Sequence, residues 1–381
     1  MKIIIACEIY PPDIGGPATF VKNIIPVLKQ AGHQIQVITY ADSNDSADGV
    51  IRISRKTNLF LRYLKYFLAI RKISQDADLI FAQGPLASGL PAILVKKLTG
   101  KKVFIKVVGD VAWERAYNQG KITEAADDFQ TKKYSAAIER QKKIRSWTVK
   151  NADLIITPSE YLKKLVYGWG VAPNKIKVIY NAISAKRKSQ TQEQAKRQLG
   201  LEGKIILFVG RLTPWKGLET LIDLLPVWLM VERDLKLVIV GEGPSEKILK
   251  LRIKNLKLED KVRLVGRLDQ TSVGDYYQAA DIFVLNSAYE GLSHTLLEAL
   301  SFGLPAVVSN VGGNPEVVKN EINGFLVEYN DQQQILEAVK KIAQNQELAK
   351  SFQKANQEVL EKFSVAKMNQ DYLATLDSTN Y

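Results

Sequence analysis

Short apolar runs alternate with longer stretches of helical spacing from one end of the chain to the other. Many of the short runs are apolar at every position, as strands that are buried on both faces of a parallel sheet require. In the first half, the predicted strands are 3–7, 34–39, 50–54, 79–82, 103–108, 154–157 and 177–180. In the second half, they are 205–209, 237–240, 262–265, 282–285, 306–309 and 325–327. The pattern therefore predicts two α/β sheets, one in each half.

The stretch between the two series, residues 184–194, reads S-A-K-R-K-S-Q-T-Q-E-Q. Its polar and charged sequence predicts a linker between domains of residues 1–185 and 186–365. Two domains also suit a chain of 381 residues, which is long for one core. Ligands of such sheets bind beyond the carboxyl ends of the strands, so two sheets that face each other would enclose a cleft.

The composition is that of a soluble globular protein, with 46% hydrophobic and 24% charged residues. The only cysteine, Cys7, can form no disulfide within the chain, so a reducing compartment fits. The first apolar run is too short for a signal peptide, and no later run approaches the length of a membrane span. We therefore expect a cytoplasmic protein.

The net charge is +13, and the whole excess lies in the first half. Residues 1–190 carry 31 Lys and Arg against 15 Asp and Glu, whereas the remainder carries 22 against 25. This asymmetry favours a polyanionic partner for the first half, either an anionic membrane surface or nucleic acid. A basic surface that serves solubility alone is an equally good interpretation.

The segment 59–73, L-F-L-R-Y-L-K-Y-F-L-A-I-R-K-I, mixes apolar, aromatic and basic residues at helical spacing. Such a helix can lie in a membrane interface. The favoured interpretation is a helix that covers the first sheet, with its Arg and Lys side chains reaching outward to water.

Two cations follow the predicted strand 205–209 in G-R-L-T-P-W-K-G at 210–217, before a helical pattern. The Arg211 guanidinium can make two hydrogen bonds to phosphate oxygens, and Lys216 can add a point charge. Together they suit a diphosphate leaving group. Two ordinary surface cations are the alternative, but their place between a strand-ending Gly and a helix-starting Gly favours a site. V-G-E-G-P at 240–244 closes the next strand, and its glycines would let a ligand approach the backbone closely.

A polar turn follows the predicted strand 282–285, and an amphipathic helix opens near Ser293. The N–H groups of the helix start form a site for an anion. Glu290 lies in the turn and Glu298 inside the helix, so one carboxylate can meet the reacting end of a ligand and the other a more distant part. A solvated loop glutamate and a helix-surface glutamate are an equally good interpretation. The other candidates in this turn are Gly291, Leu292, Ser293 and His294.

The predicted strand 3–7 leads into Y-P-P-D-I-G-G-P at 10–17 and then into a helix. The pair Gly15 and Gly16 can cradle a phosphate at the helix start, although paired glycines also serve ordinary turns. The pattern is not the G-x-G-x-x-G of a dinucleotide-binding domain, and G-x-x-x-x-G-K-[ST] does not occur in the sequence.

Three similar tetrapeptides, at 77–80, 152–155 and 280–283, each place an Asp at the entry of a predicted strand. These aspartates are expected to serve the turn. Asp76 and Asp78 also have the D-x-D spacing used for metal–diphosphate binding. Because they lie at the entry of a strand and not at its carboxyl end, no metal site is predicted there.

Taken together, these motifs resemble those of glycosyltransferase family 4, the retaining, nucleotide-sugar-dependent enzymes of the GT-B fold. The resemblance covers nearly the whole chain, and it also includes S-F-G-L-P at 301–305 and G-G-N-P-E at 312–316. It implies two Rossmann-like α/β domains that face each other across a cleft. The first would bind the acceptor and the second the donor, and a final helix, 367–381, would cross back to the first domain.

The resemblance also implies a role for each motif residue. Arg211 and Lys216 would neutralise the donor diphosphate, and Glu298 would bind the ribose. Glu290 would contact the transferred sugar, and backbone near Leu268 would hold the base.

In the first domain, the resemblance implies that Gly16 borders the reacting phosphate. Many members have a His after the strand that corresponds to 103–108, whereas Gly109 and Asp110 follow it here. Asp110 would then be the polar group near the sugar. His33, at a helix-to-strand turn, is expected to be structural, whereas His294 lies at the helix start between the two glutamates and could touch the donor.

The expected function is that of a retaining hexosyltransferase in the synthesis of a cell-envelope glycan, a polysaccharide or a glycolipid. The donor would be a UDP- or GDP-linked sugar, the acceptor a glycan or glycolipid, and neither a cofactor nor a metal would be needed. A position on the inner face of the membrane stays open. An epimerase or a glycoside phosphorylase of the same fold is the nearer alternative. A nucleic-acid-binding protein would leave the motifs of the second half unexplained, and stacking platforms are not apparent, so no nucleic acid is expected.

Overall fold

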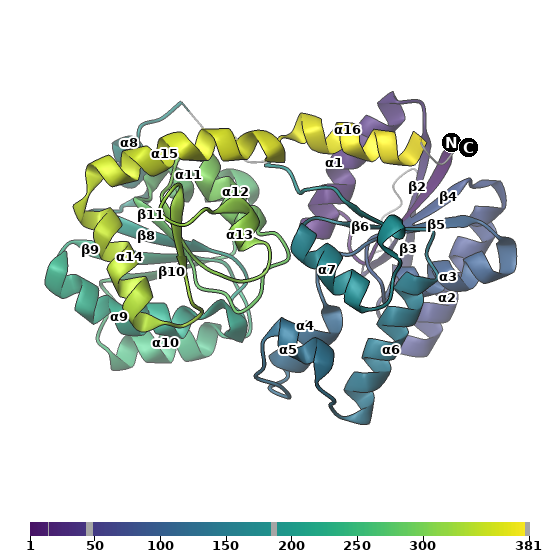
Figure 1. Cartoon of the computed structure of the whole chain (residues 1–381), viewed down its shortest axis with the longest axis horizontal. Coiled ribbons are helices and arrows are strands. Elements are labelled where there is room, and N and C mark those ends of the chain that lie inside the picture. Colours follow the sequence, from purple (N-terminus) through teal and green to yellow (C-terminus); the bar gives the residue numbers. More distant parts are fainter. Residues whose placement is uncertain (14, 43–48, 184–188, 378–381) are drawn as a thin grey trace. The chain divides into compact units, whose positions relative to one another are not determined.

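A computed structural model describes residues 1–13, 15–42, 49–183 and 189–377. The chain divides into two compact units. Unit 1 consists of Met1–Ala116, Asp127–Ile179 and Met368–Tyr381, and unit 2 consists of Tyr117–Ala126 and Tyr180–Lys367. Each unit is built on one parallel sheet that helices cover on both faces (Figure 1). The predicted α/β class is therefore confirmed.

The sheet of unit 1 has the strand order β3-β2-β1-β4-β5-β6-β7. Its strands are β1 (Lys2–Ala6), β2 (Gln34–Ala41), β3 (Val50–Ser54), β4 (Leu79–Ala82), β5 (Lys102–Lys106), β6 (Leu154–Thr157) and β7 (Ile176–Val178). Its helices are α1 (Gly16–Gln30), α2 (Leu59–Ile73), α3 (Gly89–Thr99), α4 (Val111–Asn118), α5 (Ala126–Thr131), α6 (Ala136–Lys150), α7 (Glu160–Gly168) and α16 (Val365–Asp377). The chain leaves β1 toward β2 on one side and returns to β4 on the other side, so the order reverses between β1 and β4.

Helices α2, α3 and α6 lie on one face of this sheet, and α1 and α16 lie on the other (Figure 1). Phe20 of α1, Phe81 of β4 and Tyr372 of α16 pack their rings together, with the Phe20 and Tyr372 centroids 5.1 Å apart. The end of the chain therefore contributes directly to the hydrophobic core of unit 1.

The sheet of unit 2 has the order β10-β9-β8-β11-β12-β13. Its strands are β8 (Lys204–Val209), β9 (Leu235–Val240), β10 (Val262–Gly266), β11 (Ile282–Leu285), β12 (Ala306–Ser309) and β13 (Gly324–Val327). Its helices are α8 (Gln192–Leu199), α9 (Leu218–Val231), α10 (Glu246–Asn255), α11 (Gln270–Ala279), α12 (His294–Ser301), α13 (Asn314–Val317), α14 (Gln332–Gln344) and α15 (Gln346–Leu360). Here the order reverses between β8 and β11, and ligands of open parallel sheets bind at such a point.

Every predicted strand has a counterpart whose bounds differ by two residues or fewer. The predicted linker was wrong at its end, because α8 begins at Gln192. Thr191 caps this helix, and the side chain of Gln194 accepts a hydrogen bond from the Thr191 N–H at 2.8 Å, which completes a capping box. Residues 184–188 of that prediction lie outside the described residues.

Helix α2 covers the first sheet, as the favoured interpretation of its sequence predicts. It packs against β2, β3 and α3, and the hydroxyl of its buried Tyr66 donates to the carbonyls of Cys7 and Ile38, each at 3.0 Å. In the described part of the chain, no helix is long and apolar enough to cross a membrane.

Candidate functional site

The loops after β8 and β11 meet where the strand order of unit 2 reverses. The N–H of Ala288 donates to the carbonyl of Trp215 at 2.8 Å, which joins the two loops. Next to this bond, the ammonium of Lys216 forms an ion pair with the carboxylate of Glu290. Both side chains are mostly buried, with 13% and 11% of their surface exposed. Two candidate residues that are 74 positions apart are therefore in direct contact.

Two glycines of the loop after β12 hold the backbone of this site. Gly313 donates its N–H to the carbonyl of Glu290 at 3.0 Å. Gly312 has a φ of +59°, and a Cβ atom there would lie 1.9 Å from the carbonyl oxygen of Glu290. A Cβ at Gly313 would lie 2.3 Å from the carbonyl oxygen of Gly291. The close approach explains why this loop carries two glycines in a row.

A pair of asparagines fixes the start of the same loop. The Asn286 amide donates to the carbonyl of Gly217 at 3.0 Å and to the side-chain oxygen of Asn330 at 2.7 Å. The N–H of Asn330 returns a bond to the Asn286 side-chain oxygen at 2.9 Å. Neither residue belongs to the set predicted from the sequence. Asn286 directly follows a buried strand, which is a usable signal, whereas Asn330 follows β13 in a loop with no motif of its own.

Helix α12 begins beside Glu290. Ser293 is its N-cap, and the Ser293 hydroxyl accepts a hydrogen bond from the N–H of Leu296 at 3.2 Å. Leu292 and Ser293 are buried, whereas His294 is exposed. The first turn of the helix thus carries backbone N–H groups at the carboxyl edge of the sheet, where they favour an anion.

Glu298 lies one turn into α12 and is held by the neighbouring helix α11. The hydroxyl of Tyr277 donates to a Glu298 carboxylate oxygen at 3.1 Å. Burial, followed by the nearby Glu298 charge, raises the pKa of Tyr277 well above its usual value, so Tyr277 stays a donor. Its ring stacks on Phe302 at 5.4 Å between centroids. Tyr277 was not predicted from the sequence, because an aromatic residue within a helix has the appearance of ordinary core.

The remaining candidates of unit 2 lie at the same edge of the sheet. Arg211 is exposed, and within the described residues its guanidinium forms no hydrogen bond or ion pair. Leu268 follows β10 and packs partly buried against the core of unit 2. Gly241 and Gly243 approach the preceding loop closely, because Cβ atoms there would lie 1.9 Å from the Gly210 oxygen and 2.3 Å from the Leu212 oxygen. These glycines are therefore needed for packing between loops.

Two family models together match almost the whole chain. The model described as Glycosyltransferase Family 4 matches residues 14–187, and the one described as Glycosyl transferases group 1 matches residues 189–359. The chain belongs to glycosyltransferase family 4. The resemblance drawn from the motifs is confirmed, and with it the general activity of a glycosyltransferase.

Individual relatives agree with this family. A Campylobacter jejuni protein, N-acetylgalactosamine-N,N'-diacetylbacillosaminyl-diphospho-undecaprenol 4-alpha-N-acetylgalactosaminyltransferase, is 25% identical over 97% of this chain and 98% of its own length. An uncharacterized glycosyltransferase of Methanocaldococcus jannaschii is 36% identical over 45% of this chain, and the match spans about half, 46%, of that relative. The solved structure of Anabaena HepE in complex with UDP and glucose has a TM-score of 0.80 at 19% identity, covering 99% of both chains. This likeness shows the GT-B fold.

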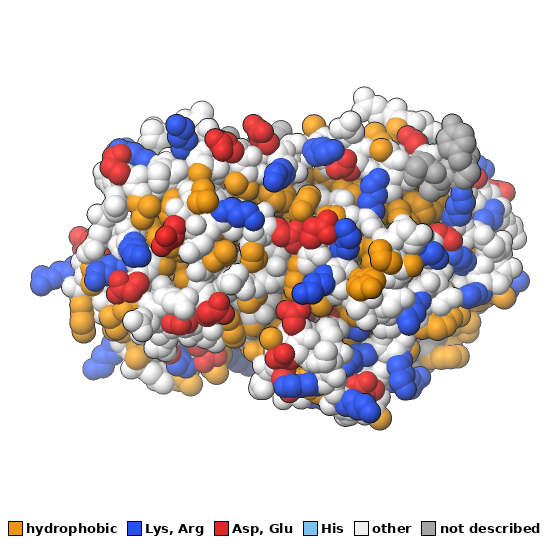
Figure 2. All heavy atoms as spheres, viewed as in Figure 1, with side chains coloured by type: hydrophobic (Ala, Val, Ile, Leu, Met, Phe, Trp, Pro, Cys, Tyr) orange, Lys and Arg blue, Asp and Glu red, His pale blue; other side chains and the backbone are white. Residues whose placement is uncertain are grey.

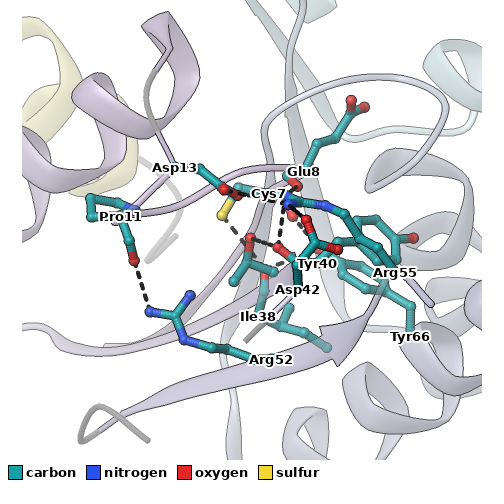
Figure 3. Close-up of polar contacts among 11 residues, drawn as sticks. Cys7, Glu8, Pro11, Asp13, Ile38, Tyr40, Asp42, Arg52, Arg55 and Tyr66 are labelled. Atoms are coloured by element: carbon teal, nitrogen blue, oxygen red, sulfur yellow. Dashed lines mark hydrogen bonds and ion pairs between the residues drawn. The ribbon is translucent and has the colours of Figure 1, made fainter. Parts of the chain in front are cut away.

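In unit 1 of the glycosyltransferase, Gly15 and Gly16 lie at the start of α1, beyond the end of β1. Gly15 is the N-cap of α1 and Gly16 its first residue. Arg55 secures the loop that leads to them, because its guanidinium contacts Asp13, Asp42 at 3.2 Å, and the carbonyls of Glu8 and Tyr40 at 3.3 and 3.0 Å. Figure 3 shows Arg55 at the centre of these contacts. Arg55 thus ties Glu8 and Asp13, which precede the two glycines, to the end of β2, and the role of the glycines toward phosphate stays a prediction.

Glu8 is a residue of this loop that the sequence analysis did not single out. Its side chain points away from the Arg55 contacts in Figure 3. Burial raises the pKa of the Glu8 carboxyl, and the charge of Arg115 opposes that rise. An acidic residue directly after the first apolar strand, where the strand order of unit 1 reverses, is the signal that could have found it.

Asp110 lies inside unit 1 and belongs to a closed set of contacts. One carboxylate oxygen pairs with Arg145 and accepts from the Gln130 amide at 3.0 Å. The other accepts from the N–H groups of Ala112 and Trp113 at 3.1 and 3.4 Å. Asp110 is completely buried. These contacts support a role in holding the start of α4, and the predicted contact between Asp110 and the sugar stays a prediction.

The three strand-entry aspartates serve their turns, as expected. Asp78, Asp153 and Asp281 each accept a hydrogen bond at 2.7 Å from the N–H of a residue at the start of a neighbouring strand. Among the described residues, no group of three or more His, Cys, Asp and Glu is placed to hold a metal ion.

His33 is buried, and its ring lies 3.4 Å from the amino terminus. Burial lowers the pKa of His33, which fits its expected structural role.

Proposed function

We propose that this glycosyltransferase moves a sugar from a nucleoside diphosphate sugar to an acceptor hydroxyl and retains the anomeric configuration. Unit 2 binds the donor and unit 1 the acceptor. The contact between Lys216 and Glu290 carries the proposal. In a nucleotide sugar the phosphate and the sugar ring are neighbours, so a phosphate-binding cation and a sugar-binding carboxylate should also be neighbours. Glu298, further along α12, then meets the ribose.

The leaving diphosphate is stabilised without a metal in this proposal. Lys216 is already paired with Glu290, so its charge alone is insufficient. Arg211, whose side chain has no partner within the described residues, adds a second cation, and the N–H groups at the start of α12 add a fixed partial charge. We expect donor hydrolysis to proceed equally with and without a chelator. Complete loss of activity with chelator, restored by a divalent metal, would contradict metal independence.

A uridine or guanosine nucleotide is proposed as the donor base. The fold of the Anabaena protein with UDP and glucose supports testing UDP first. A thermal-shift screen of nucleoside diphosphates distinguishes the bases, since a ligand at 100 times its dissociation constant adds about 2.7 kcal/mol to the unfolding free energy. A chain that no nucleotide stabilises would count against the site.

The acceptor is proposed to be a glycan or a glycolipid of a cell-envelope, polysaccharide or glycolipid pathway. The Campylobacter relative, matched along nearly its whole length, carries diphospho-undecaprenol in its name. That name supports a lipid-linked acceptor. We propose a cytoplasmic protein that works at the inner face of a membrane, with the anionic membrane surface as a partner of its basic first half.

The product distinguishes this proposal from the other reactions of the same fold. A hexosyltransferase releases free nucleoside diphosphate and forms a new glycoside. An epimerase would return an epimerised nucleotide sugar, and a phosphorylase would release a sugar phosphate. Chromatography of the reaction products, with NMR of the new anomeric centre, tests both the reaction and its retention.

A further inference from the structure

Unit 2 contains a pocket at the edge of its sheet opposite to the loops that carry Lys216 and Glu290. The pocket is lined by residues that directly precede β11 and β12 and by side chains of α8, α11 and α15. It therefore lies at the amino ends of the strands, whereas Lys216 and Glu290 follow the carboxyl ends of β8 and β11. Its volume is about 240 Å³. Pockets for drug-sized ligands have roughly 300–1,000 Å³, so this pocket suits a single small ring.

Glutamine side chains dominate the polar lining of this pocket, which we call the amide pocket. The four glutamines are Gln192, Gln278, Gln346 and Gln353. The Gln192 amide is held in place, because its nitrogen donates to the Ala280 carbonyl at 2.7 Å and to the Asp281 carboxylate at 3.0 Å. The side-chain oxygen of Gln278 is buried and accepts no hydrogen bond from a described residue. A buried acceptor without a donor costs free energy, which a ligand hydroxyl would recover.

The other two glutamines lie on α15 and are exposed. Within the described part of the chain, neither the Gln346 nor the Gln353 side chain forms a hydrogen bond. Gly303 leaves room for the Gln353 amide, because a Cβ atom at Gly303 would lie 2.5 Å from the Gln353 side-chain nitrogen. The amide pocket thus offers hydrogen-bond donors and acceptors that no described residue uses.

The charged side chains of the amide pocket have partners of opposite sign. Asp281 pairs with Lys196 at 2.8 Å, and Lys350 pairs with Glu347 at 3.0 Å. In Figure 2, Lys and Arg side chains are mixed with Asp and Glu side chains over the upper part of unit 2, where α8 and α15 lie in Figure 1. A neutral ligand therefore fits this pocket better than a phosphate or another anion.

Apolar groups complete the lining. Leu304, Pro305 and Ala349 face the same pocket as the four amides. A sugar ring presents hydroxyl groups along its rim and C–H groups on its faces, so it matches both kinds of surface. A purely apolar ligand would leave the amides unpaired. We propose that the amide pocket binds the ring of a neutral sugar and forms a second carbohydrate site, separate from the loops after β8 and β11.

The sugar has two sources, a free monosaccharide or a residue of a glycan. The glycan source rests on the proposed function, because it requires that the chain builds a glycan. A glycan held at a second site stays at high local concentration near the enzyme. A tetrasaccharide of the same sugar distinguishes the sources. Tighter binding of the tetrasaccharide than of the monosaccharide assigns a glycan, and equal or weaker binding assigns a free sugar.

Saturation-transfer difference NMR with the full chain tests the proposal. The probes are glucose, galactose, mannose and N-acetylglucosamine. We expect at least one of them to bind with a Kd on the order of 1 mM, as suits a ligand of about a dozen heavy atoms. Saturation transfer from the chain to none of the four sugars would overturn the proposal.

Substitutions of the amides assign the bound sugar to this pocket. Gln278→Leu and Gln353→Leu should each weaken sugar binding about fivefold, the loss of one hydrogen bond. The matched control is Gln357→Leu, which removes an exposed amide of α15 outside the pocket and should change nothing. Because Gln353 is exposed, its variant tests the pocket even if the half-buried Gln278 does not tolerate leucine. Unchanged sugar binding in Gln353→Leu would contradict the proposal.

Nucleotide binding keeps this test separate from the proposed function. The leucine variants should retain the thermal shift with nucleoside diphosphate, because the amide pocket lies at the other edge of the sheet. Saturating nucleoside diphosphate should leave the sugar bound, and displacement of the sugar would place it at the donor site and refute the amide pocket. If the chain binds nucleotide but no sugar, only the amide pocket is wrong. If it binds sugar in this pocket but no nucleotide, the amide pocket stands and the donor site is wrong.

Discussion

At the scale of single residues, Asp110, Glu290 and Glu298 differ in how accessible their carboxylate oxygens are to a ligand. Both oxygens of Asp110 are bonded inside unit 1, and the residue is completely buried. Glu290 pairs with Lys216 at the carboxyl edge of a sheet. Glu298 is partly exposed and takes a hydrogen bond from Tyr277. We therefore expect ligand contacts from the two glutamates and a structural contribution from Asp110.

Tyr277 is proposed to position Glu298, and its hydroxyl can be removed without changing the shape of the core. Tyr277→Phe should weaken donor binding about three- to tenfold, because the carboxylate loses a hydrogen bond that fixes its orientation. The turnover number should hardly change. Tyr276→Phe on the same helix is the matched control. Calorimetric titration with donor measures both, and equal donor affinity in Tyr277→Phe and the unchanged chain would exclude the positioning role.

Lys106 gives unit 1 a pH-dependent stability. It is almost fully buried, its ammonium lies 3.3 Å from the centroid of the Phe20 ring, and burial lowers its pKa from 10.5 to about 7. Between about pH 7 and 10.5, the unfolded chain holds this proton and the folded chain does not, so this group makes stability rise with pH across that window. Below pH 7, Lys106 is protonated in the folded and the unfolded chain, so the free energy of unfolding is lowered by the full cost of burying the charge.

Lys106→Met should therefore stabilise the protein most at low pH. At pH 6 the gain should be about 2–3 kcal/mol, because the favourable contact with the ring offsets part of the burial cost. The gain should shrink as the pH rises toward 10. Lys22→Met, an exposed change on α1, should show no such trend. Urea unfolding at several pH values measures the difference, and a gain independent of pH would rule out Lys106 as its source.

At the scale of elements, the loop after β12 determines how precisely Glu290 is held. Gly312→Ala should cost about 3 kcal/mol or more in stability and reduce turnover, because the new Cβ would collide with the Glu290 carbonyl. Gly200→Ala is the control, since Gly200 has a φ of +60° but no atom within 4 Å of a Cβ. Gly200→Ala should lower the free energy of unfolding by about 1 kcal/mol, because only the left-handed backbone conformation disfavours the alanine. Equal losses of turnover in the two variants would contradict the collision.

Most elements could be predicted because many strands are apolar on both faces, and because the apolar residues of the helices recur every three to four positions. The helical segment 59–73 coincides with α2 for that reason. The predicted linker at 184–194 was wrong from Gln192 onward, because α8 is a short helix with a polar sequence. The start of α8 depends on a capping box at Thr191. Polarity alone does not distinguish a surface helix from a loop.

At the scale of the whole molecule, the sequence could place the motifs at strand ends but not their contacts. The ion pair between Lys216 and Glu290 depends on β8 and β11 being neighbours, which the strand order determines. The bond between Asn286 and Asn330 likewise joins loops 44 residues apart. Such contacts leave no local pattern. The exposure of Leu61, Leu64 and Leu68 on α2 was equally unpredictable, because only packing decides which leucines stay exposed.

The central claim is that Glu290 and Glu298 hold opposite ends of one nucleotide sugar. Donor binding by calorimetry, together with steady-state rates for Glu290→Gln and Glu298→Ala, tests it most directly. We predict that Glu298→Ala raises the donor KM and keeps kcat, because ribose binding is the same in the ground and transition states. Glu290→Gln should lower kcat by about a hundredfold or more, because its charge responds to the charge that develops at the anomeric carbon. Normal turnover in Glu290→Gln, or unchanged donor affinity in Glu298→Ala, would contradict the account.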